Sequence, residues 1–151
     1  MRRDTPMYPP EMLDPEADDG TMVASLDALS EAVVGHRIVS AKTVQDGSRN
    51  AGGLYGEDRG VELTLDSGRT VRLVPTSDCC AYTYAESVLL NPEKVDHVIT
   101  GVGTTDGFET WHIYADLGDV LELNVAWSCG NPFFYGYGFS VQVQDPPEDP
   151  P

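Results

Sequence analysis

The chain has 151 residues, 40% hydrophobic and 23% charged, which excludes a collagen-like, coiled-coil or wholly disordered protein. Nine Lys and Arg residues stand against 25 Asp and Glu residues, and the resulting net charge of -16 excludes a general binder of the phosphate backbone. We therefore expect an acidic globular protein that does not bind nucleic acid directly.

Proline and acidic residues gather at both ends of the chain. Residues 1–20 and 144–151 cannot bury enough apolar surface to offset the entropy of ordering, so we predict two disordered acidic tails around one globular domain at residues 21–143. The sequence shows neither an apolar run long enough to span a bilayer nor a signal peptide. The three cysteines form no spaced disulfide framework. We expect a protein of a reducing cytoplasm with no membrane association.

The first predicted element is a short amphipathic helix. Ser25 is its expected N-cap, and Leu26, Leu29 and Val33 share one face at helical spacing. Gly35 follows at the position where a left-handed residue commonly ends a helix. This helix would place one apolar stripe on a sheet.

A β-hairpin is the clearest pattern in the chain. Apolar and polar residues alternate over 61–65 and again over 71–73, and Asp66-Ser67-Gly68 between them has the composition of a tight turn. An imperfectly alternating strand is expected before it, at residues 37–44.

A second helix is predicted at residues 78–90, where Asp78 can cap it and Tyr82, Ala85 or Glu86, and Leu89 fall at helical spacing before Asn91-Pro92. Four further strands are expected, at residues 96–102, 111–115, 120–126 and 139–143. Two short helices among hairpin-linked strands predict an α+β fold, built on a strongly bent antiparallel sheet or a small open β-barrel.

The adjacent cysteines Cys79 and Cys80 follow Asp78 and would lie in the first turn of the second predicted helix. Free amide groups there lower a thiol pKa, which makes either cysteine a candidate nucleophile, although the Asp78 charge opposes ionisation. The alternative is that one cysteine is simply buried. The cysteine and histidine spacing fits no zinc pattern, so we predict neither a metal nor another cofactor.

The glycine-rich stretch at residues 101–107 looks like a phosphate-binding loop but lacks the following Lys and Ser or Thr. A strand rather than a helix is expected after it, which also excludes a dinucleotide fingerprint. We therefore predict a mobile hairpin loop. No Gly-x-Ser-x-Gly elbow supports a serine hydrolase.

Aromatic residues alternate with glycine over residues 131–139, just after Trp127. Such a loop can present rings to a ligand or partner, and the equally weighted alternative is that the rings close the end of the core. If the loop binds, the residues expected to contact the partner are Asp78, Cys79, Cys80, Trp127, Asn131, Phe133, Phe134, Tyr135 and Tyr137.

Several of these stretches together resemble a family of small uncharacterised proteins of tailed phages, especially phages of actinobacteria. The resemblance is carried by residues 60–70, by Ser77-Asp78-Cys79-Cys80, by residues 96–107 and by the loop at 130–139, and it extends over residues 35–143. It implies a phage accessory protein that acts in the host cytoplasm and an Asp-Cys-Cys segment after the second hairpin strand. It implies no assigned activity.

Three functions compete on this basis. The first is a non-enzymatic binding protein that engages a host protein or a small ligand through the aromatic loop and a sheet edge. The second is an acidic DNA mimic that blocks a nucleic-acid-binding protein, and the third is a small enzyme that uses Cys79 or Cys80. Exposed sheet edges also permit a homodimer.

Overall fold

The computed structural model describes residues 8–15, 18–45, 59–76, 81–130 and 137–146. In these residues, one helix precedes eight strands. They are α1 (Thr21–Val33), β1 (Ile38–Gln45), β2 (Arg59–Leu65), β3 (Thr70–Pro75), β4 (Tyr82–Leu90), β5 (Gly101–Thr105), β6 (Thr110–Ala115), β7 (Gly118–Ser128) and β8 (Phe139–Gln144). No helix among the described residues is both long and apolar enough to cross a membrane.

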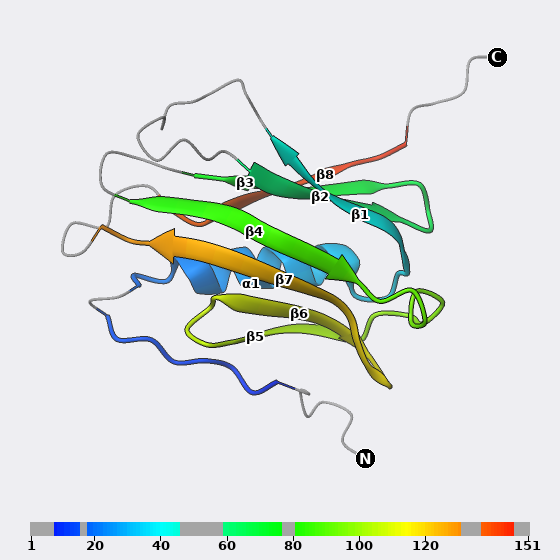
Figure 1. The fold of residues 1–151 in the computed structure, drawn as a ribbon, viewed down its shortest axis with the longest axis horizontal. Helices are drawn as coiled ribbons and strands as arrows, with labels where there is room; N and C mark the ends of the chain where they lie inside the picture. Colours follow the sequence, from blue (N-terminus) through cyan, green and yellow to red (C-terminus); the bar gives the residue numbers. More distant parts are fainter. Residues whose placement is uncertain (1–7, 16–17, 46–58, 77–80, 131–136, 147–151) are drawn as a thin grey trace.

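The strands form two four-stranded antiparallel sheets. The first sheet has the order β1-β2-β3-β8, and the second sheet has the order β4-β7-β6-β5. The two sheets lie one above the other in Figure 1, with β4 against β1 and β2. Helix α1 contacts β8 and β5, which are the edge strands of the two sheets opposite β1 and β4. The sheets therefore do not close into a barrel.

The prediction of an α+β fold with two helices is wrong, because the described chain is mainly β with a single helix. The error comes from residues 78–90. In the structure Tyr82–Leu90 is strand β4, which pairs with β7 from Tyr82 opposite Ser128 to Leu90 opposite Leu121. Tyr, Thr and Val favour strands, and pairing with the long strand β7 overrides the helical spacing of three apolar residues. The expected cap, Asp78, lies outside the described residues.

Helix α1 begins five residues earlier than predicted, with Gly20 and not Ser25 at the N-cap position. The carboxylate of Asp18 accepts the Met22 amide at 3.0 Å, and Asp19 accepts the Thr21 amide at 3.3 Å. Two acidic side chains thus satisfy amides that the first turn cannot bond internally. The predicted end is confirmed, because Gly35 has a φ of 91° just after the helix.

The hairpin of β2 and β3 is confirmed, with Val61 opposite Leu73 and Leu63 opposite Val71. These four side chains are at most 1% exposed. The predicted strand at 96–102 lies instead at Gly101–Thr105, so most of the predicted glycine loop is strand β5 and only the following residues turn. Glycine was interpreted as a loop signal, but here it leaves room for aromatic side chains on one sheet face.

The core lies between the sheets and under α1. Its largest fully buried side chains are Trp111, Phe108, Met22, Leu29, Ile38, Leu63, Leu65, Leu73, Ile99, Ile113, Leu121 and Leu123. The ring of Trp111 meets Phe108 and Phe139 edge to face, at centroid distances of 6.2 and 5.6 Å. Because these residues come from α1 and from both sheets, one apolar core holds all the layers together.

Residues Tyr8–Pro15, which we call the N-terminal strap, run beside β5 and β6 in Figure 1. We predicted a disordered tail for residues 1–20, and residues 1–7 and 16–17 lie outside the described part. In the described part, Tyr8 and Glu11 form hydrogen bonds with the second sheet, and Leu13 packs against the core. The strap therefore belongs to the surroundings of any site on this face.

Candidate functional site

The candidate site lies on the outer face of the second sheet. Trp111 and Ile113 point into the core from β6, so His112 between them points outward. On β5, Gly103 lies opposite His112, and on β7 Glu122 does so. Three neighbouring strands therefore present these positions in one row across the sheet.

A β-bulge places a carboxylate beside His112. The register of β6 and β7 shifts so that Ile113 faces Leu121 and Tyr114 faces Asp119, which leaves Val120 as an extra residue. Val120 and Leu121 are both buried, at 0% and 1% exposure. Because two consecutive residues point inward, Asp119 is turned to the outer face.

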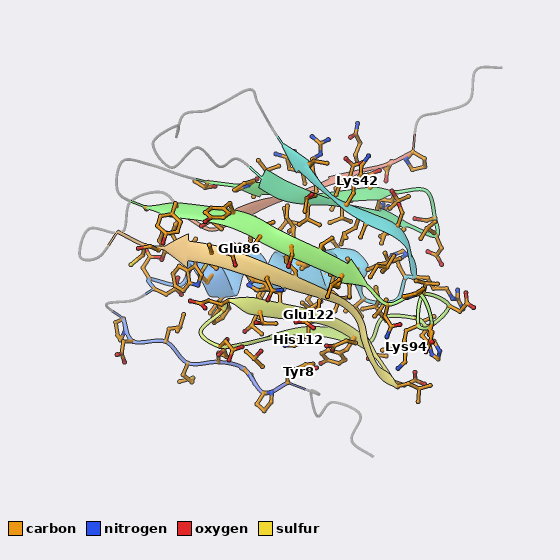
Figure 2. The ribbon with its side chains drawn as sticks, in the orientation of Figure 1. Tyr8, Lys42, Glu86, Lys94, His112 and Glu122 are labelled. Atoms are coloured by element: carbon orange, nitrogen blue, oxygen red, sulfur yellow. The ribbon has the colours of Figure 1, made fainter. Side chains whose placement is uncertain are left out.

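Four side chains, which we call the His112 cluster, then come together: Tyr8, Thr105, His112 and Asp119. The Nδ1 atom of His112 lies 2.8 Å from Oδ2 of Asp119, and its Nε2 atom lies 2.9 Å from Oγ1 of Thr105. The Tyr8 ring stacks on the imidazole at a centroid distance of 4.0 Å and an angle of 13°. Figure 2 shows Tyr8 from the strap next to His112 and Glu122.

The hydrogen bond to Asp119 places a hydrogen on one nitrogen of His112. A carboxylate can only accept, so Nδ1 of His112 carries a hydrogen, and in the neutral ring Nε2 accepts the Thr105 hydroxyl proton. The Tyr8 hydroxyl donates to Oδ1 of Asp119 at 2.8 Å. Burial raises the pKa of Tyr8 to about 12, and the Asp119 and Glu122 carboxylates act in the same direction. Tyr8 is therefore a neutral donor across the physiological range.

The hydroxyl, imidazole and carboxylate that are hydrogen-bonded in series here are also the groups of a nucleophile activated by a general base. Such a site needs free backbone amides to stabilise an oxyanion. The amides of Gly107 and Phe108, just beyond Thr105, each donate to the Glu11 carboxylate at 2.8 Å. With that position occupied and the imidazole under Tyr8, the cluster acts to hold the strap on the sheet.

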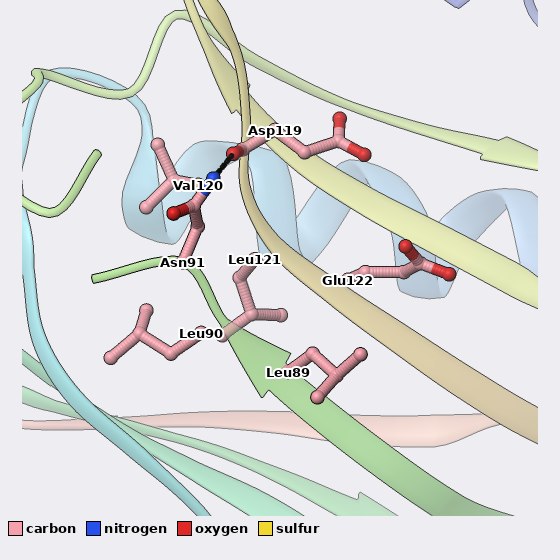
Figure 3. A pocket seen from close by; sticks show the side chains of 7 residues that line it. All are labelled: Leu89, Leu90, Asn91, Asp119, Val120, Leu121 and Glu122. Carbon is pink, nitrogen blue, oxygen red and sulfur yellow. Dashed lines mark hydrogen bonds between the residues drawn. The ribbon is translucent and has the colours of Figure 1, made fainter. Parts of the chain in front are cut away.

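A pocket of about 320 Å³ adjoins the cluster where β4 ends and β7 begins. Figure 3 shows the leucines along the two strands, with Leu90 pointing away from β7 and the carboxylates of Asp119 and Glu122 pointing to one side. We call it the β4–β7 pocket, and its lining is Leu89, Leu90, Asn91, Asp119, Val120, Leu121 and Glu122. Leu89 is 63% exposed. An apolar surface with two carboxylates at its rim suits a cation carried on an aliphatic stem.

Two of the predicted site residues, Trp127 and Tyr137, are described, and their side chains contact each other. The ring of Trp127 stacks on Tyr137 at 5.7 Å and 16°, and its indole N–H donates to the Gly107 carbonyl at 2.9 Å. Tyr137 is 5% exposed, and its hydroxyl bonds to Asp18 and Asp19. Both rings thus have structural contacts, and their part in binding stays a prediction.

The other predicted site residues lie outside the described part of the chain: Asp78, Cys79, Cys80, Asn131, Phe133, Phe134 and Tyr135. Cys129 is a buried free cysteine. Within the described residues, no three His, Cys, Asp or Glu side chains lie close enough to share a metal ion.

Sequence reasoning missed the strap, the His112 cluster and the β4–β7 pocket. One usable signal was the apolar doublet Val120-Leu121, which breaks the alternation of its strand and so indicates a bulge. Another was His112 between two core residues, since alternation alone places it on the outer face. The contact with Tyr8 had no sequence signal, because the two residues are far apart in the chain.

Comparison with known proteins adds a family. Residues 31–141 match a domain of unknown function, DUF7448. The chain belongs to this family. The expectation of membership in an uncharacterised domain family is confirmed at this level, and the phage origin stays a prediction. The DUF7448 domain carries the His112 cluster except Tyr8, and the whole β4–β7 pocket, while the strap precedes it. Neither a curated protein nor a solved structure matches the chain.

Proposed function

We propose that this DUF7448 protein is a non-enzymatic binding protein, a phage accessory factor of the host cytoplasm, that holds a basic segment of a host protein in the β4–β7 pocket. The resemblance of residues 35–143 to small phage proteins supports the setting. The pocket supports the binding. The net charge of -16 supports a basic partner, because it attracts positively charged surfaces at low salt.

The observation that carries the proposal is the carboxylate of Glu122. It is half-buried beside the exposed Leu89, its direct cross-strand neighbour. Within the described chain, no hydrogen bond or ion pair joins it to another side chain. A partly desolvated carboxylate without a counter-charge gains most when a ligand supplies the cation. A lysine or arginine side chain would lay its methylene groups on Leu89 and its charge on Glu122.

The distribution of charge on the two sheets favours the same face. The four strands of the second sheet contain no lysine or arginine. On the first sheet, Lys42, Glu62 and Arg72 stand opposite one another, and Arg72 pairs with Glu62 at 3.1 Å. The basic side chains of the first sheet thus neutralise Glu62. This face therefore gives no support to a DNA-like row of carboxylates. On the second sheet, Asp119 is bonded to His112 and Tyr8, and Glu122 is the carboxylate that we propose for a partner's cation.

The test is a titration of the ¹⁵N-labelled protein with N-acetyl-arginine amide and N-acetyl-lysine amide, followed by NMR. We expect amide shifts confined to residues 89–91 and 119–122, because these line the pocket. N-acetyl-leucine amide has the aliphatic part without the cation and should bind about fivefold more weakly.

Glu122→Gln keeps the size of the side chain and removes the charge, so it should weaken the cationic probes by about fivefold. The matched control is Glu31→Gln, which removes the same charge from an exposed position on α1. Equal binding of the leucine probe, or equal weakening by both substitutions, would show that the pocket has no preference for a cation and would refute the proposal.

A further inference from the structure

The strap occupies a surface that is built to receive it. We call this surface the strap seat, and its contact residues are Gly103, Gly107, Phe108, His112, Tyr114 and Asp119. It has one part that takes an aromatic ring and another that takes a carboxylate. The chemistry of each part can be derived from the residue that now fills it.

The aromatic part takes a ring with a hydroxyl group. A Cβ atom on Gly103 would lie 2.6 Å from Cβ of Tyr8, so only glycine lets the tyrosine approach the strand. The ring lies flat on His112 and at 59° to Tyr114. Its hydroxyl reaches Asp119, a fixed acceptor that a phenylalanine would leave unused.

The part that takes a carboxylate is a turn whose backbone amides donate hydrogen bonds to it. Asp106, Gly107 and Phe108 have φ values of 60°, 68° and 65°, and this left-handed run points consecutive amides to one side. The carbonyl groups of the same turn are also hydrogen-bonded. The indole N–H of Trp127 donates to Gly107, and the indole N–H of Trp111 donates to Phe108. The turn is therefore kept in shape by groups that do not belong to the strap.

The distance between the two parts of the seat matches a peptide in an extended conformation. Tyr8 and Glu11 are separated by Pro9-Pro10, whose rings fix φ near the extended polyproline value. Such a peptide loses little entropy on binding. The seat therefore selects an aromatic hydroxyl followed, after two residues of extended chain, by a carboxylate.

We propose that the strap seat is a peptide-binding site which takes an extended segment of a partner protein with this pattern, in competition with the chain's own strap. The seat lies within the residues that match the family, whereas the strap precedes them. The strap is also a shallow ligand: Tyr8 and Glu11 are half-buried, and Met12 is 91% exposed. This inference goes beyond the β4–β7 pocket: the two sites share Asp119, but the hydrogen bonds of Tyr8 and Glu11 go to Asp119, Gly107 and Phe108 and not to Glu122.

The test uses the full chain with Tyr8→Ala and Glu11→Gln, which frees the seat, and a fluorescein-labelled peptide with the sequence of residues 6–14. Fluorescence anisotropy should show saturable binding below about 1 mM. A peptide with Gln in place of Glu should bind about tenfold more weakly, because it loses the charge in two hydrogen bonds. The unaltered chain should also bind about tenfold more weakly, because its own strap competes.

Gly103→Ala in the same double variant is the blocking control. The three atoms nearest to the added Cβ all belong to Tyr8, so the substitution acts first on the strap position and a peptide tyrosine can no longer bind there. Peptide binding should be lost, and circular dichroism should be unchanged. If the double variant does not fold, excess unlabelled peptide is added to the ¹⁵N-labelled unaltered chain, where it should displace the strap and shift the amides of Tyr8 and Glu11.

Three results would overturn the inference. They are no saturable binding by the folded double variant, equal affinity for the Glu and Gln peptides, and binding that survives Gly103→Ala. A dimer of the unaltered chain that Tyr8→Ala abolishes would assign the seat to the strap of a second copy and would also overturn the partner proposal. Loss of the Glu122 preference would leave this inference intact, so the two proposals fail separately.

Discussion

Asp18 connects three parts of the chain, and its substitution gives the sharpest stability prediction. Its Oδ1 atom accepts hydrogen bonds from the Met22 amide at 3.0 Å and from the Tyr137 hydroxyl at 2.8 Å. Its Oδ2 atom accepts the Gly20 amide at 3.0 Å, and the residue is 8% exposed. Asp18→Ala removes all three acceptor contacts at the start of α1.

The magnitude follows from these contacts. Loss of the side chain that caps α1 costs about 1 kcal/mol. The Tyr137 hydroxyl has one hydrogen, which it shares between Asp18 and Asp19 at 2.7 Å, so loss of its contact with Asp18 costs about 1.5 kcal/mol, at the low end for a charged acceptor. We therefore expect Asp18→Ala to lower the free energy of unfolding by about 2.5 kcal/mol and the Tm by about 8 °C.

Urea unfolding followed by tryptophan fluorescence measures this change, since Trp111 is fully buried. The matched control is Asp27→Ala, which removes the same side chain from an exposed position on α1 and should stay within about 0.5 kcal/mol of the unaltered protein. If Asp18→Ala destabilises no more than Asp27→Ala, the reasoning about the start of α1 is refuted.

Three further predictions concern a tight contact and two titrations. Gly60→Ala should destabilise by about 2 kcal/mol in the same urea assay, because its Cβ would lie 2.2 Å from the backbone oxygen of Leu73; an unchanged midpoint would contradict this packing. The hydrogen bond from Tyr137 lowers the pKa of Asp19, so this carboxylate stabilises the fold above about pH 4 and loses that effect as the pH falls through its folded pKa. Asp19→Asn should therefore destabilise at pH 7 and have little effect in acid, and an equal effect at both would be inconsistent with it. Burial raises the pKa of Tyr8 to about 12, so its contribution is complete below about pH 10 and is lost as the pH rises through 12. The absorbance difference at high pH between the unaltered chain and Tyr8→Phe should show that late inflection, and an inflection near 10 would place Tyr8 in open solvent.

Alternation of apolar and polar residues was sufficient to predict most of the strands. It placed the β2–β3 hairpin correctly because both strands have one buried and one exposed face, which the sequence records residue by residue. It failed at residues 82–90, where Tyr82, Ala85 and Leu89 satisfy helical spacing as well. Only the partner strand β7 decides between the two, and a partner more than thirty residues away is not a local property.

The candidate site was hidden for a related reason. The strap has the proline and acidic composition of a disordered tail. The surfaces that hold Tyr8 and Glu11 belong to β5, β6, β7 and the turn between β5 and β6, so the strap's own sequence does not show them. Gly101 and Gly103 look like a loop in sequence, yet in the sheet they make room for the rings of Tyr114 and Tyr8. The role of these residues depends on contacts with residues that are far away in the chain.

The sequence by itself determined the acidic character, the antiparallel hairpins, the end of α1 and the pattern of the core, because charge, alternation and turn chemistry act over a few residues. The tertiary structure decided the two-sheet arrangement, the bulge that turns Asp119 toward His112, and the seating of the strap. These features depend on which strands become neighbours. That choice is made by the free energy of the whole core, to which every element contributes at once.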